Sequence, residues 1–235
     1  ALQVDQLQTI SDTALLGEYI RNSLRFDVLM DIFLEVAQSN EMIALRHSSS
    51  TTVSRVTKVE VGEKLEKFGI QISDDYQLVG DERNIRILLF EVLYTAYADQ
   101  PTPFPANVQA ATDKVEAIIE EQTQIRTTVK KAFRIFFGIW YTRLKHGHFI
   151  GDYNHQLFEP DTDLSRHARM IIDKLRKVIT LSFDNQAPWC DEELRFGLGS
   201  IYSLGIGSGS YRVANLAPDV RRKFQEIYDD VCEVY

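Results

Sequence analysis

Residues 126–146 read RTTVKKAFRIFFGIWYTRLKH, and their periodicity indicates an amphipathic helix. On a helical wheel that advances about 100° per residue, the cationic side chains fall within an arc of about 140°. Five cations make up this face: Arg126, Lys130, Lys131, Arg134 and Lys145. Phe133, Phe136 and Trp140 lie on the opposite side of the wheel. We therefore expect a helix whose rings rest on a core and whose cationic face is available to a partner.

The charge of this segment differs from that of the rest of the chain. Between Glu121 and Asp152 there are six cations and no acidic residue, whereas the 235-residue chain has a formal net charge of −8. The remaining residues therefore sum to −14. An acidic protein of this kind is not expected to coat nucleic acid with its whole surface, although a local basic site is compatible with the composition. We predict that residues 126–146 contact an acidic protein partner, a sister subunit or a nucleic-acid backbone, RNA included.

Other parts of the chain also repeat with a helical period. Apolar residues spaced three to four apart predict helices over 11–38, 81–98, 106–146 (as one helix or two), 163–182, 190–202 and 218–234. Between 53 and 72, β-branched valines favour a strand, whereas Val61, Leu65 and Phe68 favour a short helix that ends at Gly69, which we prefer. No strand pair is evident. The sequence therefore predicts an all-α helical bundle of about six to eight helices.

Three prolines in five residues interrupt the helical pattern at Pro101-Thr102-Pro103-Phe104-Pro105. Proline lacks an amide donor and disfavours the helical conformation of the residue before it, so no regular element should cross this segment. We predict a corner between an N-terminal helical half, residues 1–100, and a C-terminal half, residues 106–235. One continuous domain is equally compatible with this pattern.

The string Arg143-Leu144-Lys145-His146-Gly147-His148 matches an Arg-x4-His pattern. This pattern resembles the active-site motif of HEPN ribonucleases, all-helical proteins that cleave RNA without a metal, typically as dimers. The resemblance implies an alternative function in which Arg143 and His148 handle the scissile phosphate and the ribose hydroxyl, while Lys131 and Lys145 gather substrate. A guanidinium can stabilise phosphorane charge, and imidazole titrates near neutrality. Outside such a role, we expect the inward-pointing Arg143 to pair with a buried carboxylate.

The remaining motifs predict no cofactor. Four histidines fall between residues 146 and 167, but their spacing matches no metal site, and the glycine-rich segment 197–210 lacks a phosphate-binding pattern. Two cysteines indicate free thiols in a reducing compartment, and neither a signal peptide nor a membrane span is evident. We therefore expect a soluble cytoplasmic protein without metal. Its predicted function is non-enzymatic interaction or self-association, with the ribonuclease as the alternative.

Overall fold

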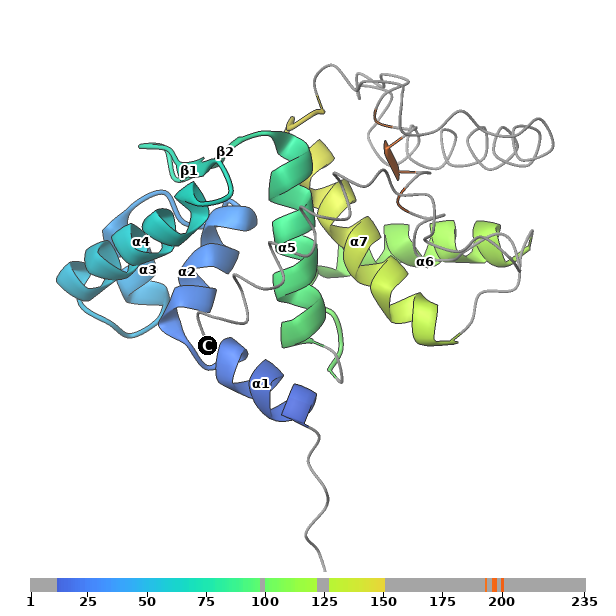
Figure 1. The fold of residues 1–235 in the computed structure, drawn as a ribbon, viewed down its shortest axis with the longest axis horizontal. Coiled ribbons are helices and arrows are strands. Elements are labelled where there is room, and N and C mark those ends of the chain that lie inside the picture. Colours follow the sequence, from blue (N-terminus) through green and yellow to red (C-terminus); the bar gives the residue numbers. More distant parts are fainter. Residues whose placement is uncertain are drawn as a thin grey trace, which may run out of the picture. The chain divides into compact units, whose positions relative to one another are not determined.

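The computed structural model describes residues 12–97, 100–121 and 127–150, together with 193, 196, 197 and 200. The regular elements are α1 (Asp12–Arg21), α2 (Leu24–Phe33), α3 (Asn40–Arg46), α4 (Thr51–Glu66), β1 (Ile70–Ile72), β2 (Leu78–Gly80), α5 (Glu82–Ala96), α6 (Ala106–Glu120) and α7 (Thr127–Lys145) (Figure 1). The predicted all-α class is confirmed, with one small hairpin added. The helices predicted over 163–182 and 218–234, and most of the one over 190–202, lie outside the described residues.

The chain divides into two compact units, Ala1–Asp113 with Lys130–Gly151 and Lys114–Val129 with Asp152–Tyr235. The first unit contains helices α1 to α5, the hairpin and most of α7, and it holds the candidate site. The division between residues 100 and 106 that the proline-rich segment suggests stays a prediction. Among the described helices, none combines the length and the apolar composition that crossing a membrane requires.

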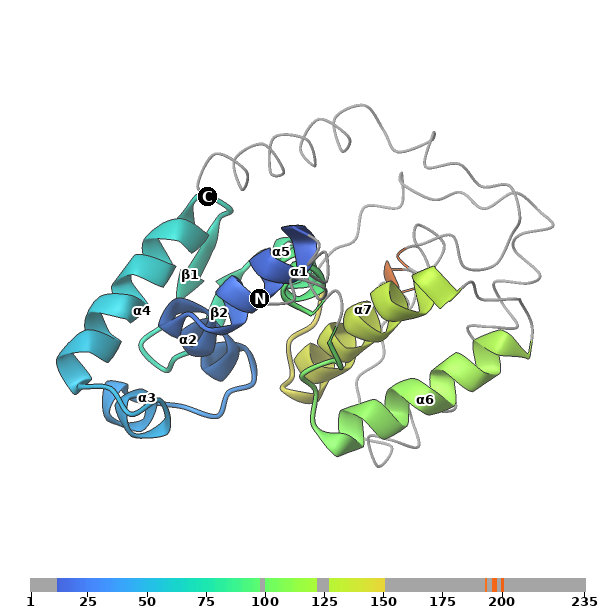
Figure 2. The same ribbon diagram turned by 90° about the horizontal axis from the view of Figure 1, so that it is seen from below.

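Helices α2, α3 and α4 form a three-helix group, and the β1–β2 hairpin lies beside the C-terminal end of α4 in both views (Figures 1 and 2). Each helix of the group begins at a serine, because Ser23, Ser39 and Ser50 accept the amide hydrogen of the residue three positions later. The core between these elements is made of fully or almost fully buried apolar side chains: Ile32, Phe33, Ile43, Val61, Leu65 and Ile70. Caps and core together fix where each short helix starts and which face it buries.

The structure corrects the bounds of two predicted helices. Residues 11–38 form two helices rather than one, because the Ser23 side chain caps a new helix at Leu24. The helix preferred for residues 53–72 is wrong beyond Glu66, since Gly69 has φ +69° and β1 follows at Ile70. The absence of a strand pair is therefore also wrong. Residues 106–146 contain two helices, α6 and α7, which is one of the two predicted alternatives.

Helix α5 lies between the three-helix group and α7 (Figures 1 and 2). The rings on α7 are buried as predicted, and Phe137 contacts Phe133, Trp140 and Tyr141 at centroid distances of 5.7–6.0 Å. All residues from 132 to 144 are buried except Arg134, which is partly exposed. Helix α7 is therefore buried over most of its described length, and apart from Arg134 its exposed or partly exposed cations lie near its two ends.

Candidate nucleic-acid interface

Helices α3 and α4 are joined by a turn of four residues, 47–50, whose shape is fixed by local hydrogen bonds. Ser48 has φ +51°, and the next amide, that of Ser49, donates to the carbonyl of Ala44 at 2.9 Å. The Ser49 hydroxyl lies 2.9 Å from the hydroxyl of Ser54 on α4. Because the turn is bonded to both helices, α4 leaves α3 in a defined direction.

A buried carboxylate holds this turn onto α2. Asp31 on α2 is 3% exposed and accepts hydrogen bonds from Arg46 Nε at 3.1 Å to both of its oxygens. The ring of His47 lies on the same carboxylate, with Nε2 2.8 Å from Oδ2. Both residues belong to the end of α3 and the start of the turn. The angle between α2 and α3 is therefore set by charged hydrogen bonds as well as by apolar packing.

Helix α4 buries one face and exposes the other. Its buried positions are Ser54, Thr57, Val61 and Leu65, which follow helical spacing toward α2 and α3. Its exposed residues in the first two turns and a half are Thr51, Thr52, Val53, Arg55, Val56 and Val59. The first nine residues of α4 carry two cations and no carboxylate, whereas the last seven carry three carboxylates and one lysine. The N-terminal half is thus the part that suits a polyanion.

The β1–β2 hairpin is held beside α4 by its own turn. Its strands are antiparallel, with Ile70 opposite Gly80 and Ile72 opposite Leu78. In the turn, Tyr76 has φ +60° and is 8% exposed, and the Lys58 ammonium of α4 lies 3.8 Å from the centre of its ring. At the other end, a side chain on Gly80 would place its Cβ 2.5 Å from the Gly69 carbonyl oxygen. Close packing at both ends keeps the hairpin in one position.

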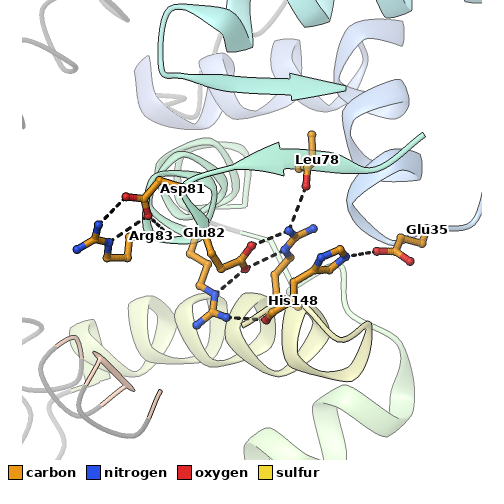
Figure 3. Close-up of polar contacts among 8 residues, drawn as sticks. Glu35, Leu78, Asp81, Glu82, Arg83 and His148 are labelled. Carbon is orange, nitrogen blue, oxygen red and sulfur yellow. Dashed lines mark hydrogen bonds and ion pairs between the residues drawn. The ribbon is translucent and has the colours of Figure 1, made fainter. Parts of the chain in front are cut away.

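A buried ionic network joins the hairpin to α5 and α7 (Figure 3). Glu82, at the start of α5, accepts from Arg143 Nη2 at 2.7 Å, from Arg143 Nε at 2.9 Å and from Arg86 Nε at 2.8 Å. Arg143 also donates to the Leu78 carbonyl of β2 at 3.3 Å. Burial acts to raise the pKa of the Glu82 carboxyl, but the hydrogen bonds and charges of Arg143 and Arg86 outweigh it, so this pKa lies below its ordinary value.

The two residues of the Arg-x4-His string are placed in this network. Arg143 is 1% exposed, and its pairing with Glu82 confirms the predicted buried carboxylate partner. The His148 carbonyl accepts from Arg86 at 3.0 Å, and the His148 ring nitrogen Nε2 lies 2.6 Å from Oε1 of Glu35, just after α2. These contacts hold the end of α7 against α2 and α5. The catalytic roles that the resemblance implies for this pair stay a prediction.

The predicted cationic face on α7 is only partly available as a surface. Arg134 pairs with Asp113 at 2.7 Å, and the Lys131 ammonium donates to the Gln100 carbonyl. Lys130 is partly exposed and Lys145 is exposed, while Arg126 lies outside the described residues. Contacts of this face with a partner or with phosphates therefore stay a prediction. No group of histidine, cysteine and carboxylate side chains that could hold a metal ion occurs in the part of the chain that the structure describes.

Helices α3 and α4 are joined by a tight turn and followed by a hairpin, and two helices joined in this way are the arrangement found in helix-turn-helix domains. Comparison with family models agrees, since residues 8–93 match the Mga helix-turn-helix domain. The similarity covers residues 8–93 of the 235-residue chain. A search of curated proteins found no match.

The interface on α4 was not among the residues predicted from the sequence. One signal was available, because Ser39 and Ser50 stand 11 residues apart and each begins a helix in the structure. A serine cap before residues 40–46 would have revealed a helix that is too short to show a period.

Proposed function

We propose that this protein binds double-stranded DNA through α4 and the β1–β2 hairpin and acts as a DNA-binding regulator. The observation that carries the proposal is the exposed N-terminal half of α4, held by the α3–α4 turn within a segment similar to a helix-turn-helix domain. In this class of domain, the second helix lies in the major groove with its N-terminal residues at the base edges. Arg55 is exposed on that half of α4 and is our candidate for a base-edge contact.

The charges of the domain favour specific over non-specific binding. Residues 8–93 contain nine cations and fourteen acidic residues. Attraction to the phosphate backbone, which supplies most non-specific affinity, is therefore weak over the domain as a whole. Cations without carboxylates occur in the first half of α4, and the acidic residues of its second half oppose closer approach there. We expect binding to depend on the contacts of that first half with the bases.

A selection experiment tests this function. The full chain is incubated with a random pool of duplex DNA, retained duplexes are amplified over several rounds, and binding is then measured by fluorescence anisotropy. Arg55→Ala should weaken binding to the selected duplex by roughly 5–150-fold, the range of one good base contact. Lys64→Ala is the matched control, since Lys64 is an exposed cation in the second half of the same helix and should matter little. Failure to retain any duplex, or equal losses from both variants, would refute the proposal.

Two sequence-based hypotheses stay open beside this proposal. The first is that residues 126–146 contact an acidic partner, a sister subunit or nucleic acid. Cleavage of RNA by Arg143 and His148 is the second. DNA binding is preferred because the N-terminal half of α4 is exposed within a segment similar to a helix-turn-helix domain, whereas the side chains of Arg143 and His148 are bonded to Glu82 and Glu35. Incubation of the full chain with labelled RNA, with His148→Ala as the comparison, would reveal cleavage directly.

A further inference from the structure

We infer that α4 selects thymine-rich DNA, and that Val53, Val56 and Val59 determine this specificity by packing on the C5-methyl groups of thymine. The inference rests on the proposed DNA binding and adds to it the kind of sequence that is recognised. Its basis is a row of apolar side chains on the exposed face of a helix in a position to enter the major groove.

The three valines form a continuous row on the surface of α4. Val53, Val56 and Val59 are 47%, 48% and 54% exposed. They are spaced three residues apart, so each is a neighbour of the next on the helix surface, with Cβ atoms about 5–6 Å apart. From the first to the last the row rises about 9 Å along the helix axis. This length corresponds to roughly three base pairs at about 3.4 Å each.

The same turns of α4 bury polar side chains in place of these valines. Ser54 is 0% and Thr57 is 7% exposed, whereas the apolar positions between and beside them point outward. An ordinary surface helix has the opposite arrangement, with its apolar stripe on the core. Single exposed apolar residues are common, but a row of three on the face expected to meet DNA indicates a contact surface. The row therefore has a function in binding rather than in the packing of the described core.

The chemistry of the major groove identifies what this row recognises. The edges of guanine, cytosine and adenine present only hydrogen-bond donors and acceptors there, and thymine adds a methyl group. Valine makes no hydrogen bonds, so it gains by covering a methyl group and loses by covering an unpaired polar edge. Arg55 on the same face can donate hydrogen bonds to a base edge, and the commonest base partner of arginine is guanine. We expect a site with consecutive thymines next to a guanine.

Replacing thymine by uracil tests the inference, because uracil pairs like thymine and lacks only the methyl group. The duplex selected with the full chain is remade with uracil at single thymines and at three thymines together. We expect binding to fall about fourfold per buried methyl and on the order of fiftyfold for three. Uracil placed outside the selected site is the DNA control.

Protein variants assign the effect to the valines. Val56→Thr exchanges a methyl for a hydroxyl of similar size at an exposed position, and the variant with all three valines replaced by threonine extends this change. We expect both to lose much of the preference for thymine over uracil, while Val36→Thr, at a 37% exposed valine outside α4, keeps it. Thermal melting followed by circular dichroism verifies that each variant is folded.

The possible outcomes distinguish the DNA-binding function from the preference for thymine. Duplexes that are bound tightly but contain no run of thymine, or that bind equally well with uracil, would overturn the assignment to thymine and leave the DNA-binding function standing. A uracil effect that persists in the triple threonine variant would overturn the role of the valines. Retention of no duplex in the selection would overturn both the function and this inference.

Discussion

Replacement of Glu82 by glutamine should destabilise the first unit strongly, because it leaves two buried guanidinium groups without their carboxylate. Arg86 and Arg143 are 2% and 1% exposed, and Glu82 is 8% exposed. Removal of one partner from a buried ion pair typically costs about 3–5 kcal/mol. A glutamine oxygen would keep part of the hydrogen bonding, so we expect a loss of about 3 kcal/mol, at the lower end of this range.

Urea unfolding followed by tryptophan fluorescence measures this loss. A Trp189→Phe background leaves Trp140, which is fully buried in α7, as the single reporter. With a slope of about 1–3 kcal/mol per molar urea, the midpoint should fall by about 1–3 M. The control is Glu60→Gln, which breaks the exposed Arg25–Glu60 pair, whose side chains are 56% and 39% exposed. An exposed pair of this kind contributes about 0–1 kcal/mol.

The dependence on pH gives a second measurement of the same effect. The pKa of Glu82 is lower in the folded protein than in the unfolded chain. The carboxylate therefore contributes stability that is fully present above its ordinary pKa near 4.5 and is lost as the pH falls through the lower folded value. The difference between the original protein and Glu82→Gln should narrow below about pH 4.5. Equal losses for the Glu82 and Glu60 variants at pH 7 would refute the assignment of stability to this network.

Three further predictions can be checked by measurements of stability. Gly62→Ala should stabilise α4 by about 0.5–1 kcal/mol, because the added Cβ meets nothing nearer than 3.9 Å. Gly138→Ala should instead cost about 1–3 kcal/mol, because its Cβ would lie 2.3 Å from the Phe104 ring. Equal effects of the two substitutions on stability would contradict both predictions. Ser50→Ala should cost about 1 kcal/mol through loss of the cap on α4, and urea midpoints unchanged from the original would disprove the cap. Burial lowers the pKa of His146 against the opposing effect of Glu35, so the stability of the fold should decrease as the pH drops below about 6.5. If His146→Gln shows the same slope of stability against pH, this histidine is excluded as the cause.

The sequence predicted best those helices whose apolar stripe faces the core. Helix α7 shows this clearly, since its rings and cations repeat with a 3.6-residue period and the rings are buried. Helix α4 was only half recognised because its first turns bury Ser54 and Thr57 and expose Val53 and Val56. The hydrophobic period there follows the exposed face rather than the core. A sequence argument that assigns apolar residues to the interior must fail at such a helix.

The sequence predicted that Arg143 needs a carboxylate partner but not which acidic residue it is. The position of Arg143 on the wheel predicted an inward guanidinium that needs a carboxylate, and the structure supplies Glu82, 61 residues earlier. Sequence spacing relates residues within one helix, and it gives no information on which of the 34 acidic residues lies opposite. The hairpin was missed for a related reason. Three-residue strands such as Ile70–Ile72 are too short to show an alternating pattern, and their pairing depends on a turn.

The burial of α7 favours α4 over α7 as the surface proposed to meet DNA. The cations of α7 are more numerous, but Arg134 pairs with Asp113, and residues 132–144 are otherwise buried. A helix enclosed in this way cannot enter a groove about 12 Å wide without leaving its core. The exposed half of α4 is not constrained in this way, because its core contacts lie on the opposite face. Through Arg143, which bonds both Glu82 and the hairpin carbonyl of Leu78, α7 instead holds the hairpin beside α4. Its contribution to binding is thus expected to be the fixed geometry of the domain.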